Sequence, residues 1–419
     1  MAVGANVVTV RRASPAATES PATESPAIEP VATEPTATSA AIAPLRPAWA
    51  EIDLGAIRHN AGLLRDLVAP AELCAVVKAW GYGHGPVQTA RAALQGGATS
   101  LAVALVEEGR QLRAAGIRAP VLLLSEPAAP AMDEVVRSGL TPTIYTEEGV
   151  QALSTAVAAS TRLEPFPVHL KVDTGMHRVG ASPDEAERIA LGVAATPELE
   201  LRGLWTHFAV ADELGSSFTN DQLELFLDVV GRLARRGVRP PVLHAANSAA
   251  ALCHPATRLN MVRCGVAVYG LAPSPEVAQH PPCPGLRPAM SLRARVSYVK
   301  EVEAGERLSY GLRYSLPTRS VVATVPLGYA DGVTRSLSVN GGKVLIGGRR
   351  YPMAGHVTMD QVLVDCGLGA DVAVGDVVVL LGRQGGQEIT AWEWAERTGT
   401  IAYEVVCGVS ARVPRSYRS

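Results

Sequence analysis

The chain has 419 residues, which is longer than one ordinary hydrophobic core supports and predicts about two domains. Hydrophobic residues make up 47% and charged residues 19%, so the chain can bury a large core, and wholesale intrinsic disorder is excluded. The formal net charge of −2, with no strongly basic stripe, excludes the electrostatic footprint of a protein that binds nucleic acid or an anionic membrane.

The first 46 residues differ in composition from everything that follows. They are rich in Ala, Pro, Thr, Ser and Glu, they contain no aromatic residue, and the segment ATESP occurs twice. Such a segment buries too little apolar surface to offset the entropy that ordering would cost. We therefore expect residues 1–46 to form a disordered, semi-extended tail.

Ordered structure is predicted to begin near Trp49. The segment AWAEIDLGAIRHNAGLLRDLV is typical of a short strand, a helix N-cap at Asp53 and an amphipathic helix. Beyond it, short β-rich runs alternate with helical stretches, from LCAVVKA through FPVHLKVD to MVRCGVAVYG. About eight such units favour a closed, eight-stranded parallel (β/α) barrel of the TIM type, which we assign to residues 47–285.

The texture of the sequence changes after the Pro-rich segment HPPCPGLRP at 280–288. Segments such as SVVATVPLGYADG and GDVVVLLG read as short strands separated by Gly and Asp turns. One short helix is expected at TAWEWAERTG, near the end of the chain. The prediction is therefore an α/β protein in which the barrel precedes a mostly antiparallel β domain at 286–419.

The cysteines and the apolar runs bear on metal binding and location. Six cysteines are scattered along the chain and none forms a C-x-x-C pair, so neither a metal site nor a redox motif is expected. No run of 18 apolar residues occurs, and no apolar segment follows Arg11 and Arg12, so neither a membrane span nor a signal peptide is predicted. Free thiols are typical of a reducing compartment, and we expect a cytoplasmic protein.

The segment AVVKAWGYGHG at 75–85 resembles the lysine box of the alanine racemase family. Members of this family use pyridoxal 5′-phosphate (PLP) and combine a barrel with a β domain. The resemblance covers nearly everything from Trp49 to Arg415 and continues, in the family's order, at KVDTGMHRVG, THFAVAD, NSAA, VRCGVAVYG, MSLRARV, SYG, PLGYADG, GHVTMDQ and YEVVCGVSARVPR. It implies an isomerase that interconverts L- and D-alanine and supplies D-alanine for peptidoglycan in cell wall biogenesis.

A racemase removes a weakly acidic α-proton and returns one on the opposite face, so it needs an electron-withdrawing cofactor and a base on each face. The resemblance makes Lys78 the Schiff-base lysine and one base, and Lys78 ends an apolar strand, where barrels place catalytic groups. It makes Tyr310 the second base, reaching the site of a partner chain, so we expect a homodimer with composite active sites. A tyrosine ordinarily keeps its proton near neutrality, so His207 and Arg263 behind it would have to favour the phenolate.

The expected cofactor contacts also rest on the resemblance. It places His207 against the PLP ring and Arg263 at the pyridine nitrogen, where a guanidinium, which keeps its proton, would weaken the electron sink and limit side reactions. Read alone, His207 is more often a satisfied core histidine, Ser248 an ordinary helix N-cap and Arg263 a surface ion pair. The phosphate would be bound by the hydroxyl and backbone N–H groups of Tyr82, Ser248, Gly265, Val266 and Tyr403.

Four further residues are assigned to the substrate or its surroundings on the same basis. Arg178 is expected at the PLP phenolic oxygen and the substrate carboxylate. Lys171 corresponds to a position that is carbamylated in some members, where the new carboxylate-like group orients the arginine. Met359 would offer its backbone N–H to the substrate carboxylate across the dimer, and Tyr329 would narrow the entrance.

Four positions depart from the family pattern. Trp80 stands where Asn or Asp is usual, and its indole would have to find space close to the pocket. Cys264 replaces a proline, Leu312 replaces a polar residue, and Thr358 replaces a frequent cysteine. None of these removes a group that the reaction needs, but Trp80 and Leu312 bear on substrate preference.

Two other functions are compatible with the sequence. One is a racemase for another, or a broader, set of amino acids. The other is a PLP-binding protein with little turnover, against which the complete set of Lys78, Tyr310, His207 and Arg263 argues. A decarboxylase of the same fold is disfavoured, because Arg263 replaces the acidic partner that such enzymes use at the pyridine nitrogen.

Overall fold

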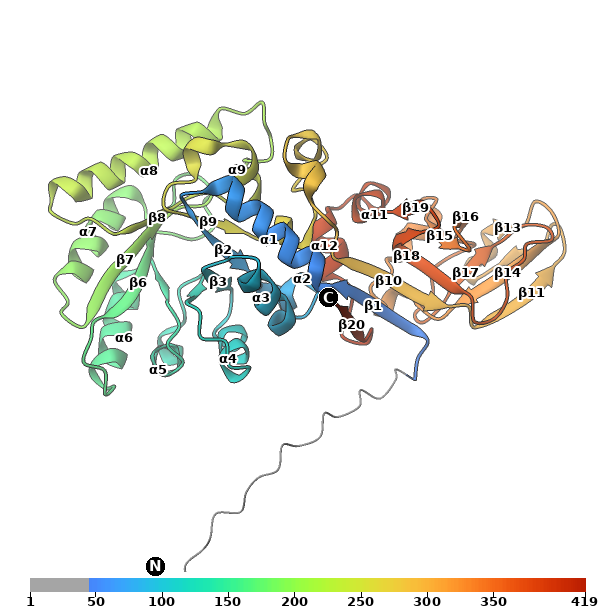
Figure 1. Cartoon of the computed structure of the whole chain (residues 1–419), viewed down its shortest axis with the longest axis horizontal. Coiled ribbons are helices and arrows are strands. Elements are labelled where there is room, and N and C mark those ends of the chain that lie inside the picture. Colours follow the sequence, from blue (N-terminus) through green and yellow to red (C-terminus); the bar gives the residue numbers. More distant parts are fainter. Residues whose placement is uncertain (1–44) are drawn as a thin grey trace, which may run out of the picture. The chain divides into compact units, whose positions relative to one another are not determined.

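The computed structural model describes residues 45–419, so the expected disordered tail at 1–46 lies almost entirely outside the described residues. Two sets of elements make up the described part, a helix-clad parallel barrel and a strand-rich C-terminal portion (Figure 1). This confirms the fold class predicted from the sequence. None of the helices formed by residues 45–419 is both long and apolar enough to cross a membrane.

The barrel consists of eight parallel strands. They form two hydrogen-bonded runs, in the order β4-β3-β2-β9 and β5-β6-β7-β8. A parallel bridge between Leu122 and Thr141 joins the runs on one side, and the Asn260 N–H donates to the Leu243 carbonyl on the other. The barrel strands are β2 (Glu72–Val76), β3 (Ser100–Val103), β4 (Val121–Leu123), β5 (Thr143–Ile144), β6 (Phe166–Lys171), β7 (Leu199–Trp205), β8 (Val242–His244) and β9 (Met261–Cys264).

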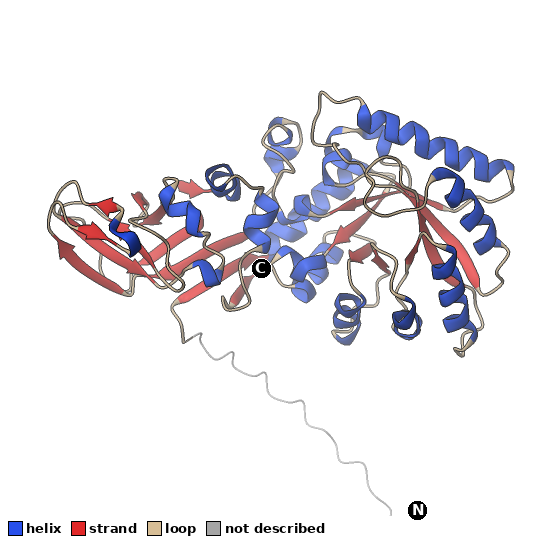
Figure 2. Ribbon diagram, turned by 180° about the vertical axis from the view of Figure 1, so that it is seen from behind, coloured by secondary structure: helices blue, strands red, loops and turns tan. Residues whose placement is uncertain are grey.

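Helices cover the outside of the barrel, as both views show (Figures 1 and 2). The first of them begins at the predicted N-cap, because the Asp53 carboxylate accepts the Ala56 N–H at 2.8 Å. The longer helices bury one stripe of apolar side chains against the strands; α8 does so with Leu223, Phe226 and Val229. The helices are α1 (Leu54–Val68), α3 (Pro86–Gln95), α4 (Val106–Ala114), α5 (Met132–Arg137), α6 (Glu147–Ala158), α7 (Pro183–Ala194), α8 (Phe218–Arg235) and α9 (Ser248–Cys253). The short segment labelled α2 (Lys78–Tyr82) has left-handed backbone angles at Ala79, Trp80 and Gly81.

The C-terminal portion is built on a mostly antiparallel sheet of order β16-β15-β18-β10-β1-β20, with β19 on β18 and with smaller sheets β11-β14-β17 and β12-β13 beside it. Its strands are β10 (Met290–Arg295), β11 (Tyr298–Val302), β12 (Arg307–Leu308), β13 (Tyr314–Ser315), β14 (Ser320–Val325), β15 (Lys343–Ile346), β16 (Arg349–Pro352), β17 (Val362–Asp365), β18 (Val377–Gln384), β19 (Gln387–Ile389) and β20 (Arg415–Arg418). Three helices occur among them, α10 (Arg335–Val339), α11 (Ala391–Thr398) and α12 (Ala402–Cys407), where the sequence predicted one.

The first ordered strand, β1 (Ala48–Asp53), does not belong to the barrel, although the sequence assigned it to the barrel range. It pairs antiparallel with β10 and parallel with β20, inside the C-terminal sheet. Its residues alternate between buried and half-buried, which is the pattern of a strand with one face on a core. Periodicity identifies such a strand correctly but does not say which sheet it joins.

Candidate active site

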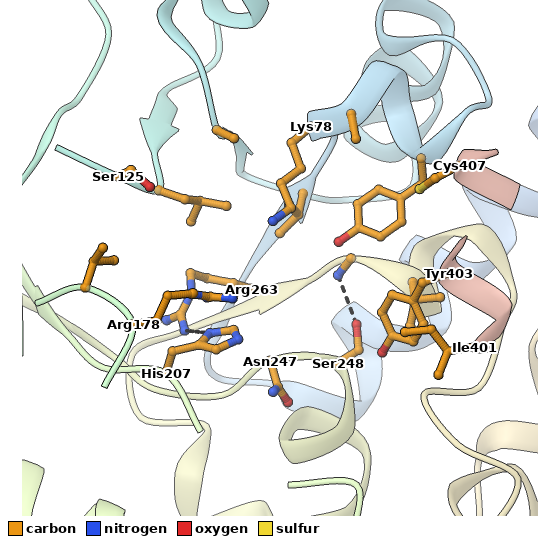
Figure 3. A pocket seen from close by; sticks show the side chains of 18 of the residues that line it. Lys78, Ser125, Arg178, His207, Asn247, Ser248, Arg263, Ile401, Tyr403 and Cys407 are labelled. Carbon is orange, nitrogen blue, oxygen red and sulfur yellow. Dashed lines mark hydrogen bonds between the residues drawn. The ribbon is translucent and has the colours of Figure 1, made fainter. Parts of the chain in front are cut away.

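A cavity of about 520 Å³ opens at the carboxyl ends of the barrel strands. Ten residues that the sequence proposed as site residues line it together. Figure 3 shows several of them around the cavity, among them Lys78, Arg178, His207 and Arg263. Nine of the ten come from the ends of barrel strands and the segments that follow, where the side chains of a parallel barrel converge, and Tyr403 comes from α12 (Ala402–Cys407) of the C-terminal portion. These ten are Lys78, Tyr82, Lys171, Arg178, His207, Ser248, Arg263, Gly265, Val266 and Tyr403.

Lys78 lies at the start of an unusual left-handed turn. The φ angles of Ala79, Trp80 and Gly81 are 52°, 58° and 61°, and that of Tyr82 is 50°. Left-handed backbone costs a non-glycine residue about 1–2 kcal/mol, so three residues here hold a strained conformation. The turn brings both Lys78 and Tyr82 to the wall of the same cavity.

Side chains from distant segments hold this turn. The Ala79 N–H donates to Glu108 Oε1 at 2.7 Å, and Arg415 Nε donates to the Gly83 carbonyl at 3.0 Å. The Arg415 guanidinium also lies over the Trp80 ring, 5.0 Å from its centroid. Trp80 is 45% exposed and does not line the cavity of its own chain. The expectation that its indole takes up space close to the pocket is therefore wrong.

Ser248, Gly265 and Tyr82 form a compact hydroxyl-lined corner. Ser248 Oγ accepts the Gly265 N–H at 2.9 Å, while the neighbouring Asn247 caps α9 by accepting the Ala250 N–H at 3.0 Å. The helix-cap reading of Ser248 is therefore wrong. A Cβ atom at Gly265 would lie 2.3 Å from Tyr82 Oη, so only glycine admits the phenol here.

Arg263 is a buried cation held almost entirely by neutral acceptors. It is 3% exposed, and it donates to His244 Nδ1 at 2.8 Å and to the carbonyls of Thr206 and Ala245 at 2.8 and 3.0 Å. Its guanidinium carbon lies 4.4 Å from the centroid of the Trp205 ring. Burial lowers the Arg263 pKa to about 10, so the side chain keeps its charge at neutral pH. The surface ion-pair reading of Arg263 is wrong.

The hydrogen bond from Arg263 fixes the tautomer of His207. A guanidinium has no acceptor, so His207 Nδ1, 3.2 Å from Arg263 Nη2, must accept. Burial, followed by the positive charges of Arg263, Lys171 and Arg178, holds the His207 pKa well below 6.5. The ring is therefore neutral and carries its proton on Nε2.

Positive charge dominates the cavity and disfavours protonation of its lysines. Burial, then Arg178, lowers the pKa of Lys78, with Glu108 acting in the opposite direction. Burial, then Arg178 and Arg263, lowers the Lys171 pKa to about 7. Both amines are thus shifted toward the neutral form, which is the nucleophilic one.

These features fit PLP. Its phosphate needs hydroxyl and N–H donors and positive potential, which the Ser248–Gly265–Tyr82 corner and the surrounding cations offer. Its aldehyde needs a lysine with a lowered pKa, as Lys78 has. In this structure the Gly265 N–H donates to Ser248 Oγ, and the other donors expected for a phosphate, the hydroxyls of Ser248, Tyr82 and Tyr403 and the N–H of Val266, belong to residues that line the same cavity.

Three proposed residues do not line the cavity of this chain. All three belong to the C-terminal portion, where Tyr310 and Tyr329 begin short 3-10 helices (Tyr310–Leu312 and Tyr329–Asp331) and Met359 lies on the loop before β17. Tyr310, Met359 and Tyr329 are 74%, 53% and 43% exposed. The segments around Tyr329 and Met359 are neighbours, because the Tyr329 N–H donates to the Thr358 carbonyl at 2.9 Å. Within one chain, therefore, the proposed second base Tyr310 is not among the residues that line the cavity of Lys78.

The sequence missed several residues that line the cavity. Trp205 directly precedes the motif THFAVAD, Asn247 is the first residue of the motif NSAA, and Ser125 follows β4, so their places after strand ends could have been predicted. Glu404 and Cys407 belong to α12, which approaches α2 from the C-terminal portion. No local pattern marks a helix that enters a site from another part of the fold.

The chain matches family models along nearly all of its ordered length. Residues 52–273 match the model described as the N-terminal domain of alanine racemase, and residues 289–417 match that of its C-terminal domain. A relative from Symbiobacterium thermophilum, named alanine racemase, is 48% identical over 374 residues, which span 89% of this chain and 97% of the relative. Another, from Desulforamulus reducens, is 45% identical over 88% of this chain and 99% of the relative.

Solved structures give the same picture. Alanine racemase from Bacillus anthracis with bound L-Ala-P has a TM-score of 0.83 and 39% identity, over 90% of this chain and 96% of that one. A histidine racemase from Leuconostoc mesenteroides has a TM-score of 0.82 but 29% identity, over 90% of this chain and 99% of that one. The fold therefore also carries racemases whose named substrate is not alanine.

Proposed function

This chain belongs to the alanine racemase family, and from that premise we propose how its residues divide the work of a PLP-dependent racemase acting on L- and D-alanine. The observation that carries the proposal is the meeting of Lys78, Arg263, His207 and the Ser248–Gly265–Tyr82 corner in one cavity. When bound, PLP withdraws electron density from the substrate's α-carbon and so acidifies its proton.

Lys78 holds PLP covalently and exchanges the α-proton on one face. Its lowered pKa supports both roles, because each requires the neutral amine. Arg263 would hold the pyridine nitrogen as a charged donor, because its own contacts are with carbonyls and histidine and its pKa of about 10 keeps the guanidinium protonated at neutral pH. Lys78→Ala should abolish the visible absorbance of bound PLP together with the activity, while Lys343→Ala, which changes a lysine outside the cavity, should change neither.

Tyr310 exchanges the proton on the other face, from the partner chain of a homodimer. The exposure of Tyr310 and its absence from the cavity of its own chain support this assignment. Met359 and Tyr329 reach the same partner site, with the Met359 N–H directed at the substrate carboxylate and Tyr329 at the entrance.

Mixed dimers test the composite site directly. In a dimer of one Lys78→Ala chain and one Tyr310→Phe chain, the lysine of the second chain meets the intact tyrosine of the first. Mixing the two inactive variants should therefore restore activity at one site of each mixed dimer. If both residues serve the site of their own chain, mixing restores nothing, and the assignment of Tyr310 to the partner fails.

Arg178 binds the substrate carboxylate, and we propose that Lys171 carries a carbamate that orients it. Lys171 lies among cations, and a carbamate would replace one positive charge by a negative one. Its pKa of about 7 makes the amine available to carbon dioxide near neutrality. The mass of one bound carbon dioxide on Lys171, present in bicarbonate and absent in Lys171→Gln, would support this.

The substrate assignment is tested by chiral analysis of a panel of amino acids. Alanine should racemise fastest, in both directions. A panel led by histidine, the substrate in the name of the Leuconostoc relative, would overturn the assignment. We further propose that the reaction takes place in the cytoplasm and supplies D-alanine for peptidoglycan; complementation of a bacterial strain that requires D-alanine tests the supply.

A further inference from the structure

A second cavity lies at the opposite, amino-terminal end of the barrel strands and has a volume of about 410 Å³. Residues that start or precede strands line it, among them Glu72 of β2, Ser100 of β3 and Val242 of β8. His169, which points inward from β6, also lines it. It shares no lining residue with the cavity that holds Lys78.

The hydrogen bonds inside the barrel determine what His169 presents to this cavity. His244 Nδ1 accepts from Arg263, so a neutral His244 carries its proton on Nε2. His244 Nε2 lies 2.9 Å from His169 Nδ1, and that nitrogen must therefore accept. His169 is thus protonated on Nε2, a donor that points away from His244 and has no hydrogen-bond partner among residues 45–419.

The surroundings of His169 keep it neutral and tightly placed. Burial, then the charges of Arg263 and Arg202, lowers its pKa to about 3. The ring lies over Gly203 on the neighbouring strand, where a Cβ atom would come within 2.4 Å of His169 Nδ1. His169 is 7% exposed as a residue, and the packing of its ring against Gly203 fixes the position of the neutral Nε2–H donor.

The rim of the cavity is positively charged. Three arginines line it against a single carboxylate, that of Glu72. The Arg113 guanidinium donates to backbone carbonyls, such as those of Ile117 and Ala119. Arg202 has one contact of 3.3 Å with Glu200, and Arg118, which is exposed, makes no hydrogen bond or ion pair within the described part of the chain.

We propose that this cavity binds a small oxyanion, with one oxygen accepting the His169 Nε2–H and the others facing the guanidinium groups of Arg118 and Arg202. The neutral His169 Nε2–H and the guanidinium groups of Arg118 and Arg202 suit a carboxylate or a phosphate-type anion. Guanidinium groups bind both kinds of anion through paired N–H···O bonds. The site is separate from the proposed function and does not depend on it.

The test uses the PLP-loaded enzyme, so that the phosphate corner at Ser248 is filled. Inorganic phosphate and succinate are titrated separately by calorimetry, and the ring N–H signal of His169 is followed by NMR in protein labelled at histidine. The tighter of the two probes identifies which kind of oxyanion the cavity prefers. Arg118→Gln and Arg202→Gln remove one guanidinium each, and Arg58→Gln removes an exposed arginine of α1 that does not line the cavity.

We expect binding of at least one probe with a shift of the His169 signal, weakened roughly tenfold or more by each rim variant and unchanged by Arg58→Gln. Arg178→Gln, in the substrate site, should leave this binding intact. The proposal is overturned if neither probe moves the His169 signal. It is equally overturned if binding survives both rim variants or is lost in Arg178→Gln, because the anion would then occupy another place.

Discussion

Gly265→Ala tests the corner that is proposed to hold the PLP phosphate. The added Cβ atom would lie 2.3 Å from Tyr82 Oη and 2.9 Å from Tyr82 Cζ, both well inside normal contact, so the phenol must move by about an ångström. That movement removes the Tyr82 hydroxyl from the phosphate. A hydrogen bond to a charged group contributes about 1.5–3 kcal/mol, so PLP should bind roughly 10- to 100-fold more weakly.

The dissociation constant of PLP is measured by fluorescence titration of the apoenzyme, with circular dichroism to verify folding. Gly192→Ala is the matched control, because a Cβ atom there meets nothing within 4 Å. Tyr82→Phe should produce a similar loss, and the double variant should be less affected than the sum of the two, since both remove the same contact. Wild-type affinity in a folded Gly265→Ala protein would show that Tyr82 does not bind the phosphate.

Three further outcomes are expected. Gly203→Ala should lower the free energy of unfolding by about 1–3 kcal/mol, because its Cβ atom would fall 2.4–2.6 Å from three ring atoms of the buried His169. Denaturant titration measures this loss. Gly231→Ala in α8, where the nearest contact of the new Cβ atom is 3.6 Å, is the control and should stabilise the protein. Carbamate on Lys171 should increase as pH rises through about 7, because carbon dioxide reacts with the free amine and the folded-state pKa lies there and not at 10.5. Mass spectra at a fixed total concentration of bicarbonate should show an occupancy that levels off above about pH 8, and an occupancy that keeps rising to about pH 10 would contradict the assigned pKa. Arg415→Met keeps the alkyl part of the side chain but removes the donor to four backbone carbonyls, those of Gly83, Val409, Ser410 and Val413. Both the affinity for PLP and the free energy of unfolding should fall, the latter by about 1–3 kcal/mol. A variant that is less stable but binds PLP normally would show that the guanidinium does not position the left-handed turn after Lys78.

Much of the candidate site could be predicted from the sequence because a parallel barrel converts sequence position into spatial position. Lys78, Lys171, His207, Ser248 and Arg263 each lie at or just after a strand end, and all five line one cavity. Their grouping follows from strand periodicity and the barrel topology. Their roles at PLP rest on the family resemblance, because the structure shows which residues line the cavity and not which atom of PLP each one contacts.

The parts that could not be predicted depend on long-range contacts. The roles of His169 and His244 emerge from a chain of hydrogen bonds that begins at Arg263 and crosses the barrel interior. In the sequence, each is one histidine on an apolar strand, which is ordinarily a core residue. The outward place of Trp80 depends likewise on Arg415, a residue from the far end of the chain.

The pairing of β1 also constrains how the protein can fold during synthesis. β1 leaves the ribosome before the whole barrel, yet its antiparallel partner β10 follows about 240 residues later, and its parallel partner β20 is later still. Throughout translation of the barrel, both edges of β1 lack their native neighbours, which makes this segment a target for chaperones or for premature pairing with another nascent chain. The C-terminal sheet can be completed only once the last strand has emerged from the ribosome, so the sheet forms late, however fast the barrel folds.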